Sequence, residues 1–263
     1  MYFKYLLILC SLIFPSKIFA YSFDQKTSDK EITRFYDFSK MPNYYLPHKY
    51  NTTKKAAQIE NETLKVTVEP GMRGSTFDKE FKQTERALLG FKMPINGTLY
   101  YSFVVKTPEG FKSVDEQFDE VRTMITQVKT PPATHSSSPP VAVYVSDYGS
   151  AKCLEYKEGP SRDTRGRKNN IKQISHTVRI YDLYRIDLND RDWHKIEIIL
   201  RISKTNGYCK IVIDGQTIIE KNNLSNLAGK IKYLRPQIGI YRDNLSYNQT
   251  VYFDDLKFKF TPE

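Results

Sequence analysis

The stretch DWHKIEIILRISKTNGYCKIVIDGQTII, residues 192–219, contains two apolar runs separated by a turn signal. In residues 196–202 and again in residues 209–214, apolar side chains largely alternate with polar ones. A period of two is typical of a strand that buries one face. Asn206-Gly207 lies between the runs, and this pair readily supplies the positive φ angles of a tight hairpin turn. The stretch therefore predicts an antiparallel β-hairpin.

The rest of the chain shows the same signals at fairly even spacing. Short runs rich in β-branched and aromatic residues recur between Gly, Pro, Asn or Asp, and the chain contains 19 Tyr and 15 Phe. Helical periodicity is nearly absent. We therefore expect an all-β fold, a jelly roll or concanavalin-like sandwich of two antiparallel sheets with a concave substrate groove. The other predicted strands are residues 62–69, 98–106, 121–128, 141–145, 237–241 and 250–260.

The N-terminal residues 1–20 have the layout of a secretory signal peptide. Lys4 precedes an apolar run at residues 5–14, and Ala20 is a small residue at a suitable cleavage point. The run is shorter than the roughly 20 residues that a membrane-spanning helix needs. We therefore expect residues 21–263 to be secreted or periplasmic without stable membrane insertion. They form a single predicted domain, because one all-β domain commonly reaches roughly 200–250 residues.

The chain is basic, with 40 Lys and Arg against 30 Asp and Glu and a net charge of +10. Such an excess concentrates polyanions near the surface and speeds their capture. Nucleic acid, anionic lipid and acidic glycans all fit this charge, and so does an ordinary solvated surface. Basic residues are dense in the polar segment 157–172, which predicts either a flap over a polyanion or an ordinary loop.

Cysteine usage indicates one crosslink. The chain has three cysteines. Cys10 lies in the predicted signal peptide, so Cys153 and Cys209 remain after its cleavage. In an oxidising compartment two cysteines indicate a disulfide, and the alternative is two separate buried thiols. No Cys or His spacing matches a metal site. We expect no cofactor, and a structural Ca²⁺ near Asp254-Asp255 is left open.

Two C-terminal motifs carry a family resemblance. Residues 235–243 read RPQIGIYRD, and residues 252–257 read YFDDLK. Together with the hairpin at 192–219, they resemble the heparin-lyase-type polysaccharide lyases and, more distantly, the alginate and glucuronan lyases that share the β-jelly roll. The resemblance covers residues 62–260, most of the chain after the leader. It implies that Trp193 anchors the hairpin and is not a platform for a sugar.

Individual residues can be compared with the motifs of these lyases. The families end with a Lys-x-Gly-x-Tyr strand whose Tyr is the catalytic acid, or both acid and base. Gly239 and Tyr241 match this pattern, whereas Gln237 stands in place of the Lys. Alginate-lyase-like enzymes also carry a Gln-x-His strand, in which Gln neutralises the substrate carboxylate and His is the base. Gln127 matches that motif, and Lys129 replaces the His.

The implied reaction removes the C5 proton of a uronic acid and expels the 4-linked oxygen. An enzyme must then neutralise the carboxylate and hold a base and an acid within hydrogen-bond reach. The resemblance implies that Gln127 binds the carboxylate, assisted by Lys129 or Gln237. Tyr241 would transfer the protons, provided that nearby cations lower its pKa from about 10. Gly239 would leave room for the sugar ring.

Further side chains complete the predicted site. His176 is a candidate base if its loop folds over the groove, and Tyr144 is placed to stack on a sugar or hydrogen-bond it. An Arg-x-Glu strand of the relatives resembles residues 83–86, where Glu85 matches and is expected to orient a cation. The catalytic set is Tyr241, Gln127, Lys129 and His176, and the substrate-binding set is Glu85, Arg86, Tyr144, Arg235, Gln237 and Arg242.

The resemblance implies an exported, monomeric lyase that cleaves a uronic-acid-containing acidic polysaccharide by β-elimination and does not bind nucleic acid. A non-catalytic, lectin-like protein on the same fold is the alternative, because Gln237 and Lys129 depart from the family pattern. A glycoside hydrolase on a similar sandwich would need two carboxylates that face each other across the cleft. The sequence contains no Glu-x-Asp-x-Glu-like strand that would supply them.

Overall fold

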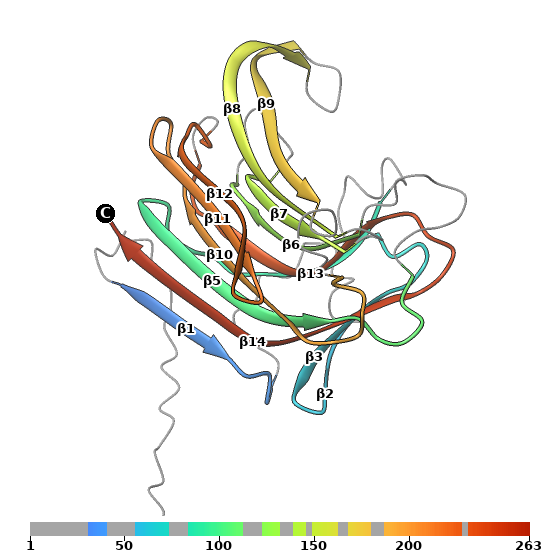
Figure 1. Cartoon of the computed structure of the whole chain (residues 1–263). Coiled ribbons are helices and arrows are strands. Elements are labelled where there is room, and N and C mark those ends of the chain that lie inside the picture. The colour runs from blue at the N-terminus through green and yellow to red at the C-terminus, as the bar shows by residue number, and fades with distance from the viewer. Residues whose placement is uncertain are drawn as a thin grey trace, which may run out of the picture.

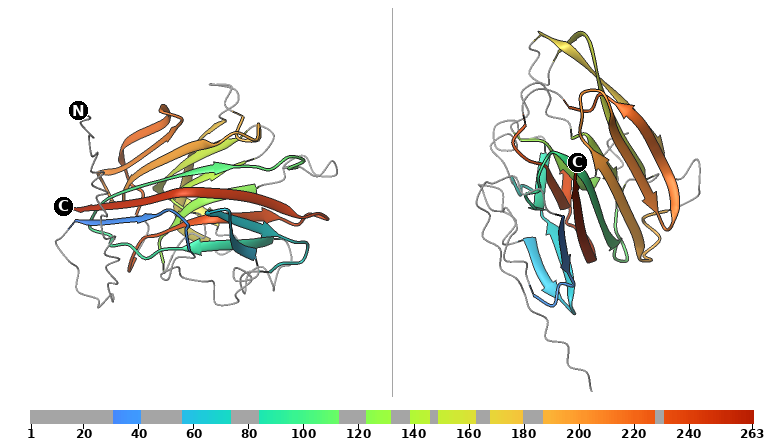
Figure 2. Two further views of the ribbon diagram at one scale, coloured as in Figure 1. Left: turned by 90° about the horizontal axis from the view of Figure 1, so that it is seen from below. Right: turned by 90° about the vertical axis from the view of Figure 1, so that its left-hand side faces the viewer.

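The structure is a computed structural model that describes residues 31–40, 56–73, 84–112, 123–131, 139–145, 149–162, 168–179, 187–227 and 231–263. These residues form fourteen strands in two antiparallel sheets, which pack against each other as a sandwich (Figures 1 and 2). The predicted all-β, two-sheet architecture is confirmed.

The two sheets differ in size and strand order. Sheet A has the order β12-β11-β10-β5-β14-β3-β2, with β1 paired to β14, and sheet B has the order β4-β13-β6-β7-β8-β9. The strands of sheet A are β1 (Ile32–Tyr36), β2 (Ala57–Glu60), β3 (Thr63–Val68), β5 (Gly97–Lys106), β10 (His194–Arg201), β11 (Gly207–Ile213), β12 (Gln216–Leu224) and β14 (Gln249–Pro262). Those of sheet B are β4 (Thr84–Gly90), β6 (Thr123–Lys129), β7 (Val141–Tyr144), β8 (Ser150–Arg162), β9 (Lys168–Arg179) and β13 (Arg235–Asp243).

The core lies between the sheets and is built from alternate residues of their strands. In β3, Leu64, Val66 and Val68 are fully buried while the residues between them are partly exposed. Sheet B contributes Ile238 and Ile240 of β13 in the same way. Each such side chain stabilises the fold by roughly 1.5–3 kcal/mol through burial. Because one face of each strand fills the core, the other residues form two outer faces, one on each sheet.

The hairpin of β10 and β11 forms as predicted, but its turn differs. Residues 202–206 connect the strands, so the prediction of a tight turn at Asn206-Gly207 is wrong. A Cβ at Gly207 would lie 2.3 Å from Oδ1 of Asn226, whose amide binds the backbone of Arg201 and Ser203. Glycine is needed there for close approach and not for a positive φ. The two-residue turn follows β11, where Asp214 and Gly215 have φ angles of 50° and 80°.

The basic segment 157–172 is largely a β-ribbon and not a loop. Lys157 pairs with Lys172, and Arg162 pairs with Lys168, while residues 163–167 lie outside the described residues. The far part of the β8–β9 hairpin extends beyond the other strands (Figures 1 and 2). A ribbon that no second sheet covers needs no apolar face, so it lacks the alternation by which strands are recognised.

One covalent bond joins the two sheets. Cys153 of β8 and Cys209 of β11 form a disulfide across the core, so they are not two separate thiols. The crosslink ties the β8 side of sheet B to the β10–β11 hairpin of sheet A.

The structure bears only partly on the predictions about the signal peptide, the membrane and metal ions. The predicted signal peptide, residues 1–20, lies outside the described residues. Within the described ranges, no helix is long and apolar enough to cross a membrane. The same ranges, which include Asp254 and Asp255, contain no group of three or more His, Cys, Asp or Glu side chains arranged to hold a metal ion.

Trp193 does not anchor the hairpin from inside. Its side chain is 41% exposed, and it is one of two large hydrophobic side chains that are exposed in the described part of the chain. The expected structural role is therefore corrected: the residue immediately before β10 points outward.

Candidate functional site

Most of the predicted site residues gather around β13, which lies between β4 and β6 in sheet B. Directly opposite residues of paired strands share a face of the sheet. Gln237 is opposite Gln127, Arg235 is opposite Lys129, and Tyr241 is opposite Arg86. Since Ile238 and Ile240 fill the core, this is the outer face of sheet B. The β13 face is defined by Arg86, Gln127, Lys129, Arg235, Gln237 and Tyr241.

Two amides form the centre of the β13 face. Nε2 of Gln127 donates a hydrogen bond to Oε1 of Gln237 over 3.0 Å, and the two residues are 0% and 1% exposed. Oε1 of Gln127 and Nε2 of Gln237 have no hydrogen-bond partner among the described residues. Reversing both amides would also leave one N–H donor and one carbonyl acceptor unpaired. A buried polar atom without a partner costs about 1–3 kcal/mol, so the pair is suited to a polar ligand.

A guanidinium lies beside this amide pair. A Cβ at Gly90 would lie 3.2 Å from Cγ and Cδ of Arg235 and 3.3 Å from Nε2 of Gln237, so the Arg235 side chain crosses Gly90 next to the amide. Nε of Arg235 has no hydrogen-bond partner in the part of the chain that the structure describes. Burial lowers the pKa of Arg235, Tyr233 opposes this change, and Arg86 lowers the pKa further. Arginine nevertheless stays charged in proteins, so two neighbouring cations favour an anion here.

Tyr241 lies at the other end of the β13 face. Cζ of Arg86 is 4.0 Å from the centre of the Tyr241 ring, an arrangement typical of a cation–π contact. Arg86 is 7% exposed, whereas Tyr241 is partly exposed. The contact holds the phenol in place and sets a fixed positive charge next to it. A tyrosine in this setting can reach a bound ligand and exchange a proton with it.

The same face continues onto β7 and β8. Tyr144 is opposite Met124 of β6, and Lys152 is opposite Ala142, in the row that contains Gln127. Nζ of Lys152 is 5.8 Å from the centre of the Tyr144 ring. Tyr144 therefore shares the face that contains Gln127 and Tyr241, and Lys152 is a cation on this face that was not among the predicted site residues. Alternation along β8 would place Lys152 on this face, but it can be used only after β8 has been recognised as a strand.

Glu85 and Arg242 do not lie on the β13 face. Nη2 and Nε of Arg242 lie 2.7 and 2.8 Å from Oε2 of Glu85, and both residues are almost fully buried. Glu85 also pairs with Arg73 over 3.1 Å. Burial lowers the pKa of Arg242, and the Glu85 carboxylate counteracts this change. The prediction that Glu85 orients a cation agrees with this geometry, but the prediction that the two residues bind substrate is corrected: they lie on the core side of sheet B.

His176 is also separated from the β13 face. It is opposite Cys153, whose sulfur points into the core toward sheet A, so His176 shares the inner face of sheet B. Its Nε2 lies 3.1 Å from Oε2 of Glu155. Its segment is strand β9 and not a loop that folds over a groove. The structure therefore does not bring His176 to Gln127 and Tyr241 as a base.

Glycine is required at position 239 for a structural reason that the sequence does not reveal. Its φ is 131°, and a Cβ there would lie 2.2 Å from the carbonyl oxygen of Ala87 on β4. Other residues rarely adopt such a φ, and the contact is with rigid backbone. The glycine is thus required for the close approach of β13 to β4, in place of the expected space for a sugar ring.

Solved structures share the fold at low sequence identity. An endo-β-1,4-glucuronan lyase from the fungus Trichoderma reesei is 14% identical, with a TM-score of 0.55 over 86% of this chain and 94% of that one. A κ-carrageenase from Pseudoalteromonas carrageenovora in complex with an oligotetrasaccharide of κ-carrageenan is 11% identical, with a TM-score of 0.50 over 89% and 97%. These likenesses show the fold alone. No curated protein matches this chain.

The sequence as a whole gives a more specific result. A family model described as polysaccharide lyase matches residues 24–257, which include both strands of the amide pair, Tyr241 and the 192–219 hairpin. The match extends over nearly the full length of the chain, so it covers the two sheets and not one motif. The chain therefore belongs to the polysaccharide lyase family.

Proposed function

We propose that this polysaccharide lyase cleaves a uronic-acid-containing polysaccharide by β-elimination on the β13 face. One observation carries the proposal: a buried amide pair, formed across β6 and β13, and the unpaired Nε–H of Arg235 lie on the same face of sheet B as Tyr241. A carboxylate is the natural ligand of such donors, because charge-assisted hydrogen bonds are roughly twice as strong as neutral ones.

Carboxylate binding is the first chemical requirement. Cγ and Cδ of Arg235 lie beside Nε2 of Gln237 at Gly90, and neither Nε of Arg235 nor Nε2 of Gln237 has a partner among the described residues, so one carboxylate group could accept from both. These donors are already fixed by packing and by the Gln127 bond. They would neutralise the carboxylate and stabilise the negative charge that develops on it when the C5 proton leaves. Lys129, opposite Arg235, adds positive charge to the same end of the face.

Proton transfer is the second requirement. Tyr241, acting as a phenolate, would remove the C5 proton and become a phenol, and the electron pair of that C–H bond would form the C4–C5 double bond. The bond from C4 to the 4-linked oxygen then breaks, and the leaving oxygen takes the proton back from Tyr241. The products are a new chain end and an unsaturated uronate. Arg86 supports this role because its guanidinium lies against the phenol ring.

Export is part of the proposal. Two features support it, the signal-peptide layout of residues 1–20 and the disulfide between Cys153 and Cys209. Disulfides persist in oxidising compartments and are rare in the cytosol. An enzyme outside the cytoplasm also meets polysaccharides directly, before any transport.

The test is an ultraviolet assay for the unsaturated uronate. The purified chain is incubated separately with glucuronan, alginate, heparin and a neutral β-1,4-glucan. We expect absorbance to rise with at least one uronate polymer and to stay flat with the neutral glucan. Binding to the uronate polymers without any rise would overturn the proposal and favour the lectin-like alternative, in which Gln237 and Lys129 have replaced catalytic groups.

A further inference from the structure

A second set of aromatic and basic side chains lies on the opposite side of the sandwich. Lys106 of β5 is opposite Tyr252 of β14, while their neighbours Val105 and Phe253 are buried in the core. Lys106 and Tyr252 therefore lie on the outer face of sheet A. The β13 face is the outer face of sheet B, so the core separates the two surfaces.

The side chains form a row that alternates aromatic and cationic residues. Trp193 precedes His194, which pairs with Val105, so Trp193 lies beside Lys106, and Tyr252 is opposite Lys65 of β3. Nζ of Lys106 lies 4.9 Å from the Trp193 ring and 5.9 Å from the Tyr252 ring, and Nζ of Lys65 lies 5.9 Å from the Tyr252 ring. Strand spacing makes this row roughly 14 Å wide, so it can accommodate more than one ring of a ligand.

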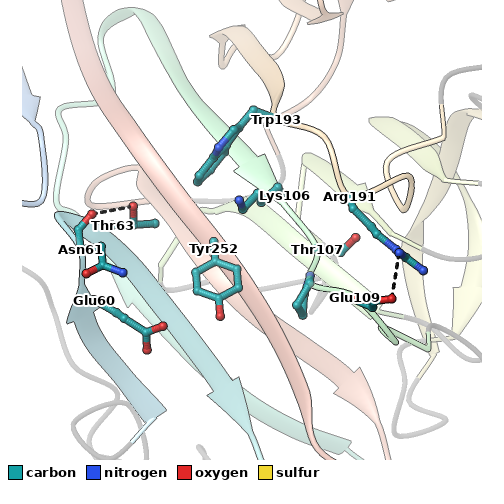
Figure 3. Close-up of a pocket in the computed structure, with 10 residues that line it drawn as sticks. Glu60, Asn61, Thr63, Lys106, Thr107, Glu109, Arg191, Trp193 and Tyr252 are labelled. Atoms are coloured by element: carbon teal, nitrogen blue, oxygen red, sulfur yellow. Dashed lines mark hydrogen bonds and ion pairs between the residues drawn. The ribbon is translucent and has the colours of Figure 1, made fainter.

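Polar groups border the row on two sides and turn it into a pocket (Figure 3). The β2–β3 turn contributes Asn61, the first residue of β3 is Thr63, and the segment after β5 contributes Thr107. The pocket encloses about 480 Å³, which lies within the usual range of about 300–1,000 Å³ for ligand sites. We call it the Trp193 pocket; its lining is Glu60, Asn61, Thr63, Lys106, Thr107, Pro108, Glu109, Arg191, Trp193 and Tyr252.

The charges of the Trp193 pocket favour an anion. Both of its carboxylates have cationic partners: Glu60 pairs with Lys65 over 2.8 Å, and Glu109 pairs with Arg191 over 3.2 Å. Lys106 makes its contacts with the two rings, and no carboxylate of the described residues pairs with it. Its ammonium group therefore carries the unneutralised charge of the pocket, between two aromatic faces.

We propose that the Trp193 pocket is a second, non-catalytic binding site for a stretch of acidic polysaccharide. The positively polarised C–H bonds of a sugar ring pack against the negative face of an aromatic ring, and Trp193 and Tyr252 offer two such faces. Lys106 between them pairs with a uronate carboxylate, while the amide and hydroxyl groups at the border bind sugar hydroxyls. The inference rests on the proposed function only for the class of polymer. A polymer held there stays close to the enzyme between cleavage events.

The chain contains one Trp, so its fluorescence reports on this pocket alone. We would titrate the Tyr241→Phe variant with a β-1,4-linked glucuronate tetrasaccharide and with the neutral glucose tetrasaccharide of the same linkage. The expected result is a saturable change in emission with the glucuronate and a roughly tenfold weaker response with the neutral sugar. Lys106→Met keeps the apolar stem and removes the charge, so it should weaken glucuronate binding by about the same factor.

A matched control exists on the same sheet. Nζ of Lys257 lies 4.9 Å from the ring of Phe35, the other exposed large hydrophobic residue, at the same distance as Lys106 from Trp193. Neither residue lines the pocket. Lys257→Met should therefore leave the titration unchanged. A double Gln127→Leu/Gln237→Leu variant should also leave it unchanged, because the amide pair lies on the other sheet.

The outcomes separate this inference from the proposed function. No saturable emission change with glucuronate, an equal response to the neutral sugar, or no effect of Lys106→Met would each overturn the second site. Loss of the response in the double Leu variant would also overturn it, since the signal would then come from the β13 face. A saturable, Lys106-dependent response in a chain that never yields unsaturated product would support the second site and contradict the proposed cleavage.

Discussion

Gln127 and Gln237 are an unusual pair of residues for the middle of a sheet. Each amide has one donor group and one acceptor, but their single mutual bond leaves Oε1 of one and Nε2 of the other without partners among the described residues. If the pair served only packing, two apolar side chains of similar shape would do as well or better. Their polarity is therefore explained by a ligand that completes the hydrogen bonds.

Replacing one or both amides tests this interpretation. Gln237→Leu leaves the Gln127 amide buried without its partner, so we expect the free energy of unfolding to fall by about 1–3 kcal/mol. The double Gln127→Leu/Gln237→Leu variant should recover most of that loss and remain inactive, because no amide is left to bind the carboxylate. Urea unfolding and the ultraviolet assay measure the two effects separately. A double variant that regains both stability and activity would show that the amides are packing residues.

His194 is the second residue whose polarity needs an explanation. Its Nδ1 lies 2.7 Å from Oδ2 of Asp214, and its Nε2 lies 2.8 Å from Oδ1 of Asp190. Burial lowers the pKa of His194, but the hydrogen bonds and charges of the two carboxylates outweigh burial, so the pKa is raised overall. A protonated ring can donate to both carboxylates, whereas a neutral ring has one donor and one lone pair.

This arrangement predicts a pH dependence of stability. A raised pKa in the folded state means that the contribution is fully present below the unfolded pKa of about 6.5 and is lost as pH rises through the folded value. We therefore expect the stability difference between wild type and His194→Asn to be larger at about pH 6 than at about pH 9. Urea unfolding at both pH values measures it. A difference that is constant with pH would contradict a charged His194.

At the scale of elements, strand β13 sets the geometry of the candidate site. It pairs with β4 without interruption from Gln237 to Asp243, but its pairing with β6 shifts between Ile238 and Tyr241. Such a shift inserts an extra residue and increases local twist, and bulges of this kind often re-aim a side chain next to an active site. Gly239 lies within the shift, pressed against the carbonyl of Ala87.

Gly239→Ala should therefore cost more stability than an ordinary glycine substitution. At Gly239 the added Cβ would lie 2.2 Å from a backbone oxygen, and the φ angle is also strained for a residue with a side chain. Gly215 has a φ of 80°, but nothing lies within 4 Å of the position of its Cβ. We expect Gly215→Ala to cost about 1–2 kcal/mol from strain alone, and Gly239→Ala to cost clearly more and to lower activity. Urea unfolding of both variants is the measurement. Equal losses would mean that β13 can move away from β4 at little cost.

The strands that could be predicted from sequence are those with one face in the core. The alternation of Leu64, Val66 and Val68 is an example, because burial of one face forces a period of two. The β8–β9 ribbon was missed because its outer part has no partner sheet to impose a period. The turn at Asn206-Gly207 was misassigned because an Asn-Gly pair signals a local turn, while Gly207 is required by the distant Asn226.

The predictions for the candidate site also separate into those that rest on local sequence and those that depend on long-range packing. Gln127 and Tyr241, which the family motifs singled out, lie on one face of neighbouring strands, and the motifs within each strand are local information. Glu85 and Arg242 were assigned incorrectly because their burial depends on which face meets sheet A. Trp193 was expected to anchor the hairpin because of the family resemblance, but the resemblance does not give the orientation of the residue just before β10, which is exposed.

At the scale of the whole molecule, the two sheets are held by the core and by one crosslink. Cys153 and Cys209 are 56 residues apart, and their bond joins β8 of sheet B to β11 of sheet A. Closing a loop of this length removes conformational freedom from the unfolded chain, which is worth about 4 kcal/mol in the chain-entropy description. The crosslink also fixes the distance between the sheets on the side where β8 and β9 extend outward.

Removing the crosslink should lower stability without disturbing the β13 face. We expect the Cys153→Ala/Cys209→Ala variant to lose about 4 kcal/mol of unfolding free energy and to retain its activity at low temperature. Urea midpoints before and after reduction of the wild type provide an independent comparison. A loss below about 1 kcal/mol would mean that the unfolded chain is already compact across this loop.

We propose complementary roles for the two outer faces of the molecule: cleavage on the β13 face, and polymer retention in the Trp193 pocket. The first role depends on Tyr241, whose ring is held against Arg86 with its phenol partly exposed. A matched control is Tyr208 of β11, which hydrogen-bonds Glu220 on sheet A over 2.6 Å, away from the β13 face.

The most direct measurement is the rate of unsaturated-uronate formation by the wild type, Tyr241→Phe and Tyr208→Phe on the same polymer. Tyr241→Phe removes only the hydroxyl, so we expect kcat to fall by about 10²- to 10⁴-fold, with folding and polymer binding nearly unchanged. Tyr208→Phe should retain the wild-type rate. Near-normal turnover by Tyr241→Phe would contradict cleavage by this tyrosine on the β13 face.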